Sequence, residues 1–494
     1  MKASSQKLAV MASVILIVSM LLSGCGSSAD TKNESASESA SGQNGKSGGD
    51  KPVSFKIVSW AGPGKKEGMD MVINEYKKIK PNVDITFEEV AQTNADFDVW
   101  MAAQLAGNQE PEVAMDFSYD SAYTKYVDKG YKVLEMDPYL DKVSPYTSKA
   151  WKDSFRDVDL NLMRSTENGK LNNIATSMVT LKIAYNKDIY DQLGLKVPTT
   201  YSEMIANFKK IREADIGVEP FSGFLKVTSA WDWFARFTAQ QTEEQSVPLI
   251  DTLLKNNKYE QDEYVKAIDN GTIDMNKPEI KNLFELFKDF TSYWAPGAIA
   301  MTNTEARDMW LQGKAASTFT INIDAKPFAS DMKPTFNWDT FEFPVMTKDV
   351  APSSNENPAE FGDLADAFVV MPSAIKENVQ DAVMDFIMFY TSPEIATKLA
   401  DMNWIIPTAG GATPNANLER YLPKNRPQNQ IDLNSQAPLG TAARQYVLQQ
   451  IQRYVLDDIT IDQLVDLIDK NMKEEVAKIK KEKGWSADND YGHK

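Results

Sequence analysis

The stretch that decides the fold is residues 53–87, VSFKIVSWAGPGKKEGMDMVINEYKKIKPNVDITF. Apolar residues alternate over 53–57, which predicts a strand, and the strand runs on to Trp60 and a Gly-Pro-Gly turn. The alternation returns over 83–87, after Pro81. A strand, a helix and a strand within about 40 residues form a βαβ unit, which predicts a parallel sheet with helices on its faces. The helical spacing between the strands is carried by Met69, Val72, Ile73, Tyr76 and Ile79.

The same pattern continues along the chain. A helix is expected through residues 100–105, with Gly107 as its stop, and a short strand over 113–115. Ligands of open α/β sheets bind beyond the carboxyl ends of the strands. The residues that follow the two predicted strands are therefore candidate ligand contacts: Trp60, Asp116, Ser118, Tyr119 and Asp120.

Composition excludes several kinds of chemistry. The chain has one histidine, His493, and one cysteine, Cys25. A Ser-His-Asp or Cys-His nucleophilic site and a zinc site need more of these residues than the chain offers. We also find no Gly-rich phosphate loop. We therefore expect no metal ion and no cofactor, although carboxylate chemistry stays open because the chain carries 70 acidic residues.

The charge of the chain argues against polyanionic partners. The formal net charge is −17 at pH 7. Nucleic acids and anionic lipid surfaces are attracted by basic proteins, so we expect no nucleic-acid partner. The acidity itself says nothing about the charge of a small ligand.

The N-terminal segment has the features of an export signal. Basic Lys2 and Lys7 precede an uncharged stretch over 8–22, which is too short for an ordinary membrane-spanning helix. Leu22-Ser23-Gly24-Cys25 resembles the lipobox of bacterial lipoproteins, which implies cleavage before Cys25, a lipid on its sulfur and attachment to a membrane. The polar residues that follow predict a flexible tether over 25–52. The remaining chain is long enough for two domains.

Beyond these features, the sequence resembles the family 1 extracellular solute-binding proteins, the sugar-binding proteins of ATP-driven importers. The resemblance spans most of the chain after the tether and depends on many short motifs in order. They are Leu105-Ala106-Gly107, Pro111-Glu112-Val113, 130–140, Asn168-Gly169-Lys170, 184–188, Gly194-Leu195, 198–203, 294–297, 313–316, Phe361-Gly362 and 367–371.

The resemblance implies an α/β, type II periplasmic-binding-protein fold, in which two α/β lobes are joined by crossover hinge strands with a ligand cleft between them. By this likeness the chain crosses near 178–181, returns near 362–366 and crosses again after Pro407. The implied divisions are the signal peptide 1–24, the lipid-anchored tether 25–52, N-terminal lobe segments 53–178 and 362–410, C-terminal lobe segments 179–361 and 411–485, and a polar tail 486–494.

Sugar recognition needs an apolar platform for the C–H face of the ring and hydrogen-bonding groups for its hydroxyls. Aromatic rings provide the platform. Trp231-Asp232-Trp233 lies where related proteins place stacking aromatics, and Trp404 precedes the last crossover. Residues 322–324 stand where relatives often show a glycine and a tryptophan, and this chain has no aromatic there. Residues 361–366 depart where many relatives have a second glycine and an aromatic, which suggests a modified subsite. The candidate ligand contacts added by these arguments are Lys65, Thr176, Trp231, Trp233, Asn322, Asp324, Asp363, Asp366 and Trp404.

These observations predict a lipid-anchored, monomeric receptor on the extracytoplasmic face of the cell membrane, on the surface of a Gram-positive cell. It would capture an oligosaccharide and deliver it to the permease of an ABC importer, without enzymatic activity. Two alternatives stay open. One is a surface glycan-degrading enzyme with paired carboxylates, and the other is a binding protein for a peptide or another small polar solute.

Overall fold

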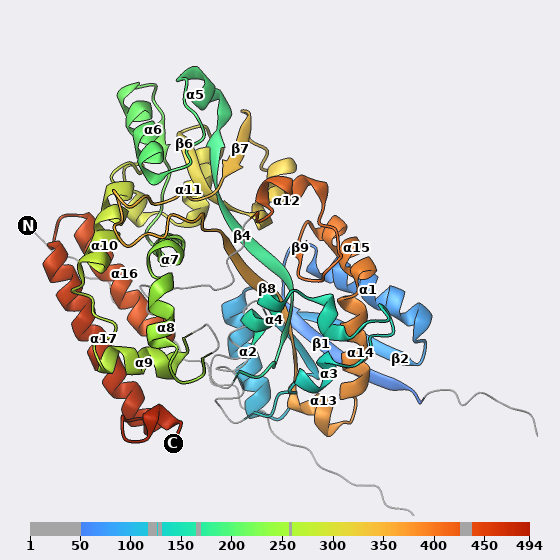
Figure 1. The fold of residues 1–494 in the computed structure, drawn as a ribbon. Coiled ribbons are helices and arrows are strands. Elements are labelled where there is room, and N and C mark those ends of the chain that lie inside the picture. Colours follow the sequence, from blue (N-terminus) through green and yellow to red (C-terminus); the bar gives the residue numbers. More distant parts are fainter. Residues whose placement is uncertain (1–50, 117–125, 127–130, 165–168, 256–258, 425–436) are drawn as a thin grey trace, which may run out of the picture. The chain divides into compact units, whose positions relative to one another are not determined.

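A computed structural model of the chain describes residues 51–116, 126, 131–164, 169–255, 259–424 and 437–494. All of these residues belong to the unit Asp50–Lys494 (Figure 1). Signal peptide 1–24, Cys25 and almost all of the predicted tether lie outside the described residues.

The strands join into one mixed sheet in the order β2-β1-β3-β8-β4-β6-β5, and β7 and β9 pair with β4 off this path. The pairs β1–β2, β1–β3 and β5–β6 are parallel, whereas β8 and β4 run antiparallel to their neighbours. The strands are β1 Val53–Trp60, β2 Val83–Ala91, β3 Val113–Asp116, β4 Ile174–Asn186, β5 Glu219–Phe221, β6 Ala315–Ile321, β7 Trp338–Phe341, β8 Phe361–Val370 and β9 Ile406–Pro407.

Helices connect these strands. In chain order they are α1 Lys65–Ile79, α2 Asn94–Ala106, α3 Asp137–Leu140, α4 Asp157–Met163, α5 Lys187–Gln192, α6 Tyr201–Glu213, α7 Ser229–Thr242, α8 Val247–Ile250, α9 Gln261–Asp269, α10 Pro278–Thr291, α11 Asn303–Leu311, α12 Ala325–Ala329, α13 Pro372–Lys376, α14 Gln380–Tyr390, α15 Pro393–Asn403, α16 Thr441–Val455 and α17 Ile461–Lys483. None of the helices in the described ranges combines the length and the apolar character needed to cross a membrane.

The predicted βαβ unit is confirmed. Strands β1 and β2 pair in parallel with Val53 opposite Val83, and α1 connects them. Four α1 residues are buried, and the spacing of Met69, Val72 and Tyr76 is what puts them on one face. The pattern of apolar residues therefore determines both the parallel pairing and the covered face of the sheet.

Helix α6 begins at a capping box. Thr200 is the N-cap, its side chain accepts a hydrogen bond from the backbone N–H of Glu203, and the Glu203 side chain answers in a capping box. Phe208 and Ile211 are fully buried on the apolar face of this helix.

Two large hydrophobic clusters divide the core between two lobes. One cluster is built from residues 55–175 and 364–399, and the other from residues 181–359 and 439–491. Strand β4 belongs to both, because Ile174 packs in the first cluster and Leu181 in the second. The chain thus has the two-lobed α/β fold, with β4 running from one lobe into the other (Figure 1). The residue numbers given above for the lobe boundaries stay a prediction.

Candidate ligand-binding site

Trp60 and Lys65 come together where β1 ends. The chain turns sharply between them, and Gly64 makes this turn with φ 73°, a left-handed conformation that favours glycine. A Cβ atom at Gly64 would lie 2.5 Å from Oδ1 of Asn403, so space also restricts this position to glycine. The turn brings Nζ of Lys65 to 3.9 Å from the centroid of the Trp60 ring, a cation–π contact.

Asp366 joins this pair from β8. Its Oδ1 lies 3.1 Å from Nζ of Lys65, and its Oδ2 accepts a hydrogen bond from Oγ of Ser177 at 3.0 Å. Asp366 has φ 52°, which is uncommon for a residue other than glycine and marks a locally strained position in the strand. We call Trp60, Lys65 and Asp366 the N-lobe cluster.

Thr176, on β4, also contacts Asp366. Its Oγ1 donates a hydrogen bond to the backbone carbonyl of Asp366 at 2.8 Å, and only 6% of the residue is exposed. Behind it lies the phenol of Tyr390, whose pKa is raised by burial and by the negative charge of Asp366. Thr176 therefore supports the backbone that carries Asp366.

A second group of candidates lies on the other lobe. Trp233 on α7 is partly buried, with its ring edge-on to Phe224 and Phe319 at centroid distances of 5.5 Å. Arg236 follows three residues later on the same helical face, and its guanidinium binds Asp363 of β8 at 2.8 Å. We call Trp233, Arg236 and Asp363 the C-lobe cluster.

Strand β8 connects the two clusters, because Asp363 and Asp366 are three residues apart. A strand rises about 3.3 Å per residue, so the Cα atoms of these two residues lie roughly 10 Å apart along β8. Each cluster combines an indole, a cation and a carboxylate. An apolar ring with charged hydrogen-bonding groups beside it can stack a sugar ring and bind its hydroxyls.

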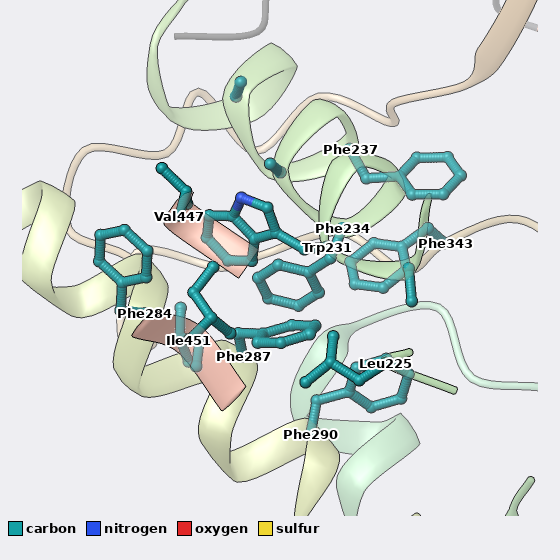
Figure 2. Packing of buried hydrophobic residues seen from close by; sticks show 14 of the residues in the cluster. Leu225, Trp231, Phe234, Phe237, Phe284, Phe287, Phe290, Phe343, Val447 and Ile451 are labelled. Carbon is teal, nitrogen blue, oxygen red and sulfur yellow. The ribbon is translucent and has the colours of Figure 1, made fainter. Parts of the chain in front are cut away.

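The structure places Trp231 in the hydrophobic core, and ligand contact of this residue stays a prediction. Its indole is only 2% exposed and is stacked on Phe284, with 4.9 Å between the centroids and 9° between the planes. The ring centroid of Phe287 lies 5.1 Å from that of Trp231, and Val447 and Ile451 belong to the same hydrophobic cluster (Figure 2). Residues 231 and 233 point in different directions on a helix, and here residue 231 faces the core.

Asn322 and Asp324 are also structural in this fold, contrary to expectation. Asn322 is 2% exposed, its Nδ2 donates to the carbonyl of Met178, and its Oδ1 accepts from the amide of Thr180. Asp324 accepts from the backbone N–H of Ile321 and pairs with Arg307 at 2.9 Å. Their polar atoms hold the backbone of β4 and of the turn after β6.

Asp116 is buried as well, at the end of β3. Its side chain is fully enclosed, and Oδ2 accepts a hydrogen bond from the hydroxyl of Tyr126 at 3.3 Å. Burial and the neighbouring carboxylate raise the pKa of the Tyr126 phenol. The structure therefore gives Asp116 a buried position beside Tyr126, and its ligand contact stays a prediction. Its predicted neighbours Ser118, Tyr119 and Asp120 lie outside the described residues.

Trp404 ends α15 with φ 55° and packs against a small cluster formed with Met178, Ile406 and Tyr421. The structure therefore gives its ring a packing role beside β4 and β9. Ligand contact of this residue stays a prediction, as it does for the members of the two clusters.

A cavity of about 540 Å³ lies elsewhere, between α1, residues 146–154 and the α14–α15 junction. It is lined by charged residues together with Tyr146 and Phe389, and it includes none of the sequence-predicted site residues. Within the described ranges, no group of three or more His, Cys, Asp or Glu side chains is placed to hold a metal ion.

Sequence reasoning missed Arg236, Ser59 and Ser177. Arg236 could have been suspected, because three residues separate it from Trp233 and such residues share a helix face. Nothing in the sequence pairs it with Asp363, which lies 127 positions away. Ser59 and Ser177 are ordinary strand residues whose role appears only when β1, β8 and β4 are brought together.

With this geometry in place, the chain can be compared with known proteins. The sequence profile of the family described as bacterial extracellular solute-binding protein matches residues 62–397, more than half of the chain. The chain belongs to this family. No curated protein sequence matches it.

Solved structures of the same fold are numerous, although their sequences have diverged. One comes from work on xylan utilisation by Caldanaerobius polysaccharolyticus, with 20% identity, a TM-score of 0.59 and coverage of 85% of this chain and 99% of that one. The cyclic α-maltosyl-1,6-maltose binding protein of Arthrobacter globiformis has 16% identity, a TM-score of 0.65 and coverage of 86% and 99%. A substrate-binding protein of Listeria monocytogenes in complex with cycloalternan has 17% identity, a TM-score of 0.58 and coverage of 86% and 100%. At these identities the likeness shows the fold alone.

Proposed function

We propose that this solute-binding protein captures an oligosaccharide between its N-lobe and C-lobe clusters and delivers it to the permease of an ABC importer. The observation that carries the proposal is the position of the two clusters. Both include a carboxylate of β8 that is paired with a cation, Lys65 lies over the Trp60 ring, and Trp233 is one helical turn from Arg236. The relatives named above, which bind glycans according to their names, support the choice of ligand class.

The paired charges favour an uncharged, hydroxyl-rich ligand. Lys65 is paired with Asp366 and Arg236 with Asp363, so neither cation is available to a ligand carboxylate without losing its protein partner. Partly buried pairs of this kind are costly to break. Sugar hydroxyls can donate to the carboxylates and accept from the cations while both pairs remain.

The proposal is tested by titrating the purified protein calorimetrically with xylotriose, maltotetraose, chitotriose and raffinose, and with a set of short peptides. We expect saturable binding to at least one glycan and recovery of that glycan intact by mass spectrometry. A cleaved glycan would instead indicate the glycan-degrading enzyme. Binding to peptides and to none of the glycans would indicate a receptor of another class.

We further propose that Cys25 carries the lipid that anchors the mature chain, as a monomer, to the outer face of the cell membrane, and that the Ser- and Gly-rich residues after it act as a tether. Cys25→Ser should lose the lipid mass and move from the membrane fraction to the medium. Retention of the variant in the membrane fraction would contradict the anchor.

A further inference from the structure

One face of the Trp60 indole is covered in the structure. The ammonium group of Lys65 lies 3.9 Å from the ring centroid. A Cβ atom added at Gly62 would lie 3.3 Å from Cε of Lys65 and 3.6 Å from Cζ3 of Trp60, so the lysine stem also runs close to the ring. The indole packs as well against a hydrophobic cluster that includes Phe97 and Met101. A ligand that stacks on the face of Trp60 under Lys65 has to displace the lysine from the ring.

Lys65 is held in this position by two oxygen atoms. Nζ lies 3.1 Å from Oδ1 of Asp366 and donates a hydrogen bond to Oγ of Ser59 at 3.2 Å. Ser59 is itself fixed, because it is fully buried and its hydroxyl donates to the carbonyl of Met115 at 2.7 Å. Ser177 fixes the other oxygen of Asp366. Only 11% of the Lys65 side chain is exposed, which distinguishes it from an ordinary surface lysine.

We propose that Lys65 is a specificity-determining residue that competes with the ligand for this face of Trp60, and that Asp366 and Ser59 are positioning residues that hold Lys65 over the ring. This inference rests on the proposed function. Ligand binding replaces the cation–π contact by a stacked sugar ring, and Nζ of Lys65 moves off the indole while it stays paired with Asp366.

This competition selects among ligands. A ligand with a broad apolar face regains, by stacking, the free energy lost with the cation–π contact. A small polar solute without such a face gains nothing in return. The covered indole therefore discriminates in favour of sugar rings whose C–H groups form a continuous face.

The test compares Lys65→Ala with Lys66→Ala in the full chain, using xylotriose, maltotetraose, chitotriose and raffinose as probes. Lys66 is the matched control because it lies on the same helix and pairs with Asp70 at 3.0 Å, with 53% of its side chain exposed. We expect Lys65→Ala to bind the recognised glycan roughly 3- to 30-fold more tightly, the range that corresponds to a cation–π contact. Lys66→Ala should bind as the wild type does.

A second measurement tests directly whether Lys65 lies over the Trp60 ring in the protein without ligand. Protein labelled with 5-fluorotryptophan gives a fluorine resonance for Trp60, which is assigned by its absence from Trp60→Phe. Without ligand, Lys65→Ala should shift this resonance, and Asp366→Asn should shift it in the same direction. The bound glycan should also shift it in the wild type. A merely structural role of Asp366 would leave the Trp60 resonance in place.

The outcomes separate this inference from the proposed function. Weaker glycan binding by Lys65→Ala would show that Lys65 contacts the ligand, and unchanged binding would show that Lys65 has no part in recognition. Either result contradicts the proposal that Lys65 competes with the ligand for Trp60. A Trp60 fluorine resonance that is the same in ligand-free Lys65→Ala and wild type would contradict the position of Lys65 over the Trp60 ring. Failure of every probe to bind wild type and variants alike counts against the proposed function instead.

Discussion

At the scale of single residues, the tryptophans of this chain fall into two kinds that the structure separates. Trp60 and Trp233 are partly buried beside a charged pair, whereas Trp231 is enclosed by aromatic rings from α10. The same side chain therefore offers a binding surface in one place and core volume in another. Substitutions should distinguish the two kinds by different measurements.

Trp60→Ala should weaken glycan binding roughly tenfold to a hundredfold, the free energy of one buried aromatic face, and should cost less stability than Trp231→Ala because Trp60 is only partly buried. Trp231→Ala should lower the free energy of unfolding by about 3–5 kcal/mol because it leaves a cavity in a packed core. Calorimetric titration and urea unfolding measure the two effects. Loss of binding in Trp231→Ala at unchanged stability would mean that our assignment of Trp231 to the core is mistaken.

The sequence could indicate that one of two neighbouring indoles faces the core, but not which one. Trp231 is enclosed by the rings of Phe284 and Phe287, which belong to a helix about fifty residues further on. Local spacing in the sequence cannot predict that this helix packs against Trp231. Asn322 and Asp324 show the same difficulty. Their polar side chains fit a sugar site as well as they fit the backbone groups that they in fact bind.

At the scale of elements, local patterns predicted what is local. The alternation in β1 and β2 and the helical spacing in α1 each depend on residues a few positions apart, and both are confirmed. The pairing of β8 with both β3 and β4 joins residues that are far apart in sequence. That pairing brings the residues of the two clusters together. It could be predicted only from the likeness to a family, because no local pattern in the sequence indicates it.

Asn322, directly after β6, adds two hydrogen bonds to the antiparallel pairing of β6 with β4. Its side-chain amide makes two hydrogen bonds to the backbone of β4 in a buried place, at 2.8 and 3.1 Å. Asn322→Ala leaves both backbone groups unpaired, which should lower the free energy of unfolding by about 1–3 kcal/mol. Urea unfolding measures this loss. A change below about 0.5 kcal/mol, the usual range for surface positions, would show that the amide does not hold the strand.

Helix α14 should make the protein sensitive to alkaline pH. Asp385 accepts hydrogen bonds from the hydroxyls of Tyr76 and Tyr146, at 2.6 and 2.7 Å. Burial and this carboxylate raise the pKa of Tyr146 above its ordinary value of 10. The folded state then keeps a proton that the unfolded state loses, so the stabilisation is complete below pH 10 and declines as the pH rises further.

Tyr146→Phe should therefore make the fall in stability between pH 9 and 11 less steep, as measured by urea midpoints. Tyr446→Phe on α16 is the control, since it removes a phenol from the other lobe. An equally steep fall in Tyr146→Phe and wild type would show that Tyr146 does not contribute to the alkaline sensitivity.

At the scale of the whole molecule, function depends on two hydrophobic clusters that share β4 and on the polar groups along β8. The family membership establishes an extracellular solute-binding protein. The clusters at Trp60 and Trp233 explain how such a fold could hold a sugar without a metal ion or a cofactor. Both lobes must contribute if this account is right.

The most direct test is calorimetric titration of the wild type, Trp60→Ala and Trp233→Ala with the glycan that binds best among xylotriose, maltotetraose, chitotriose and raffinose. These variants change one indole in each lobe. The account predicts saturable binding by the wild type and clear loss of affinity in both variants, with thermal unfolding showing that each ligand-free variant is folded at the titration temperature. Full affinity in both variants would contradict a site formed by the two clusters.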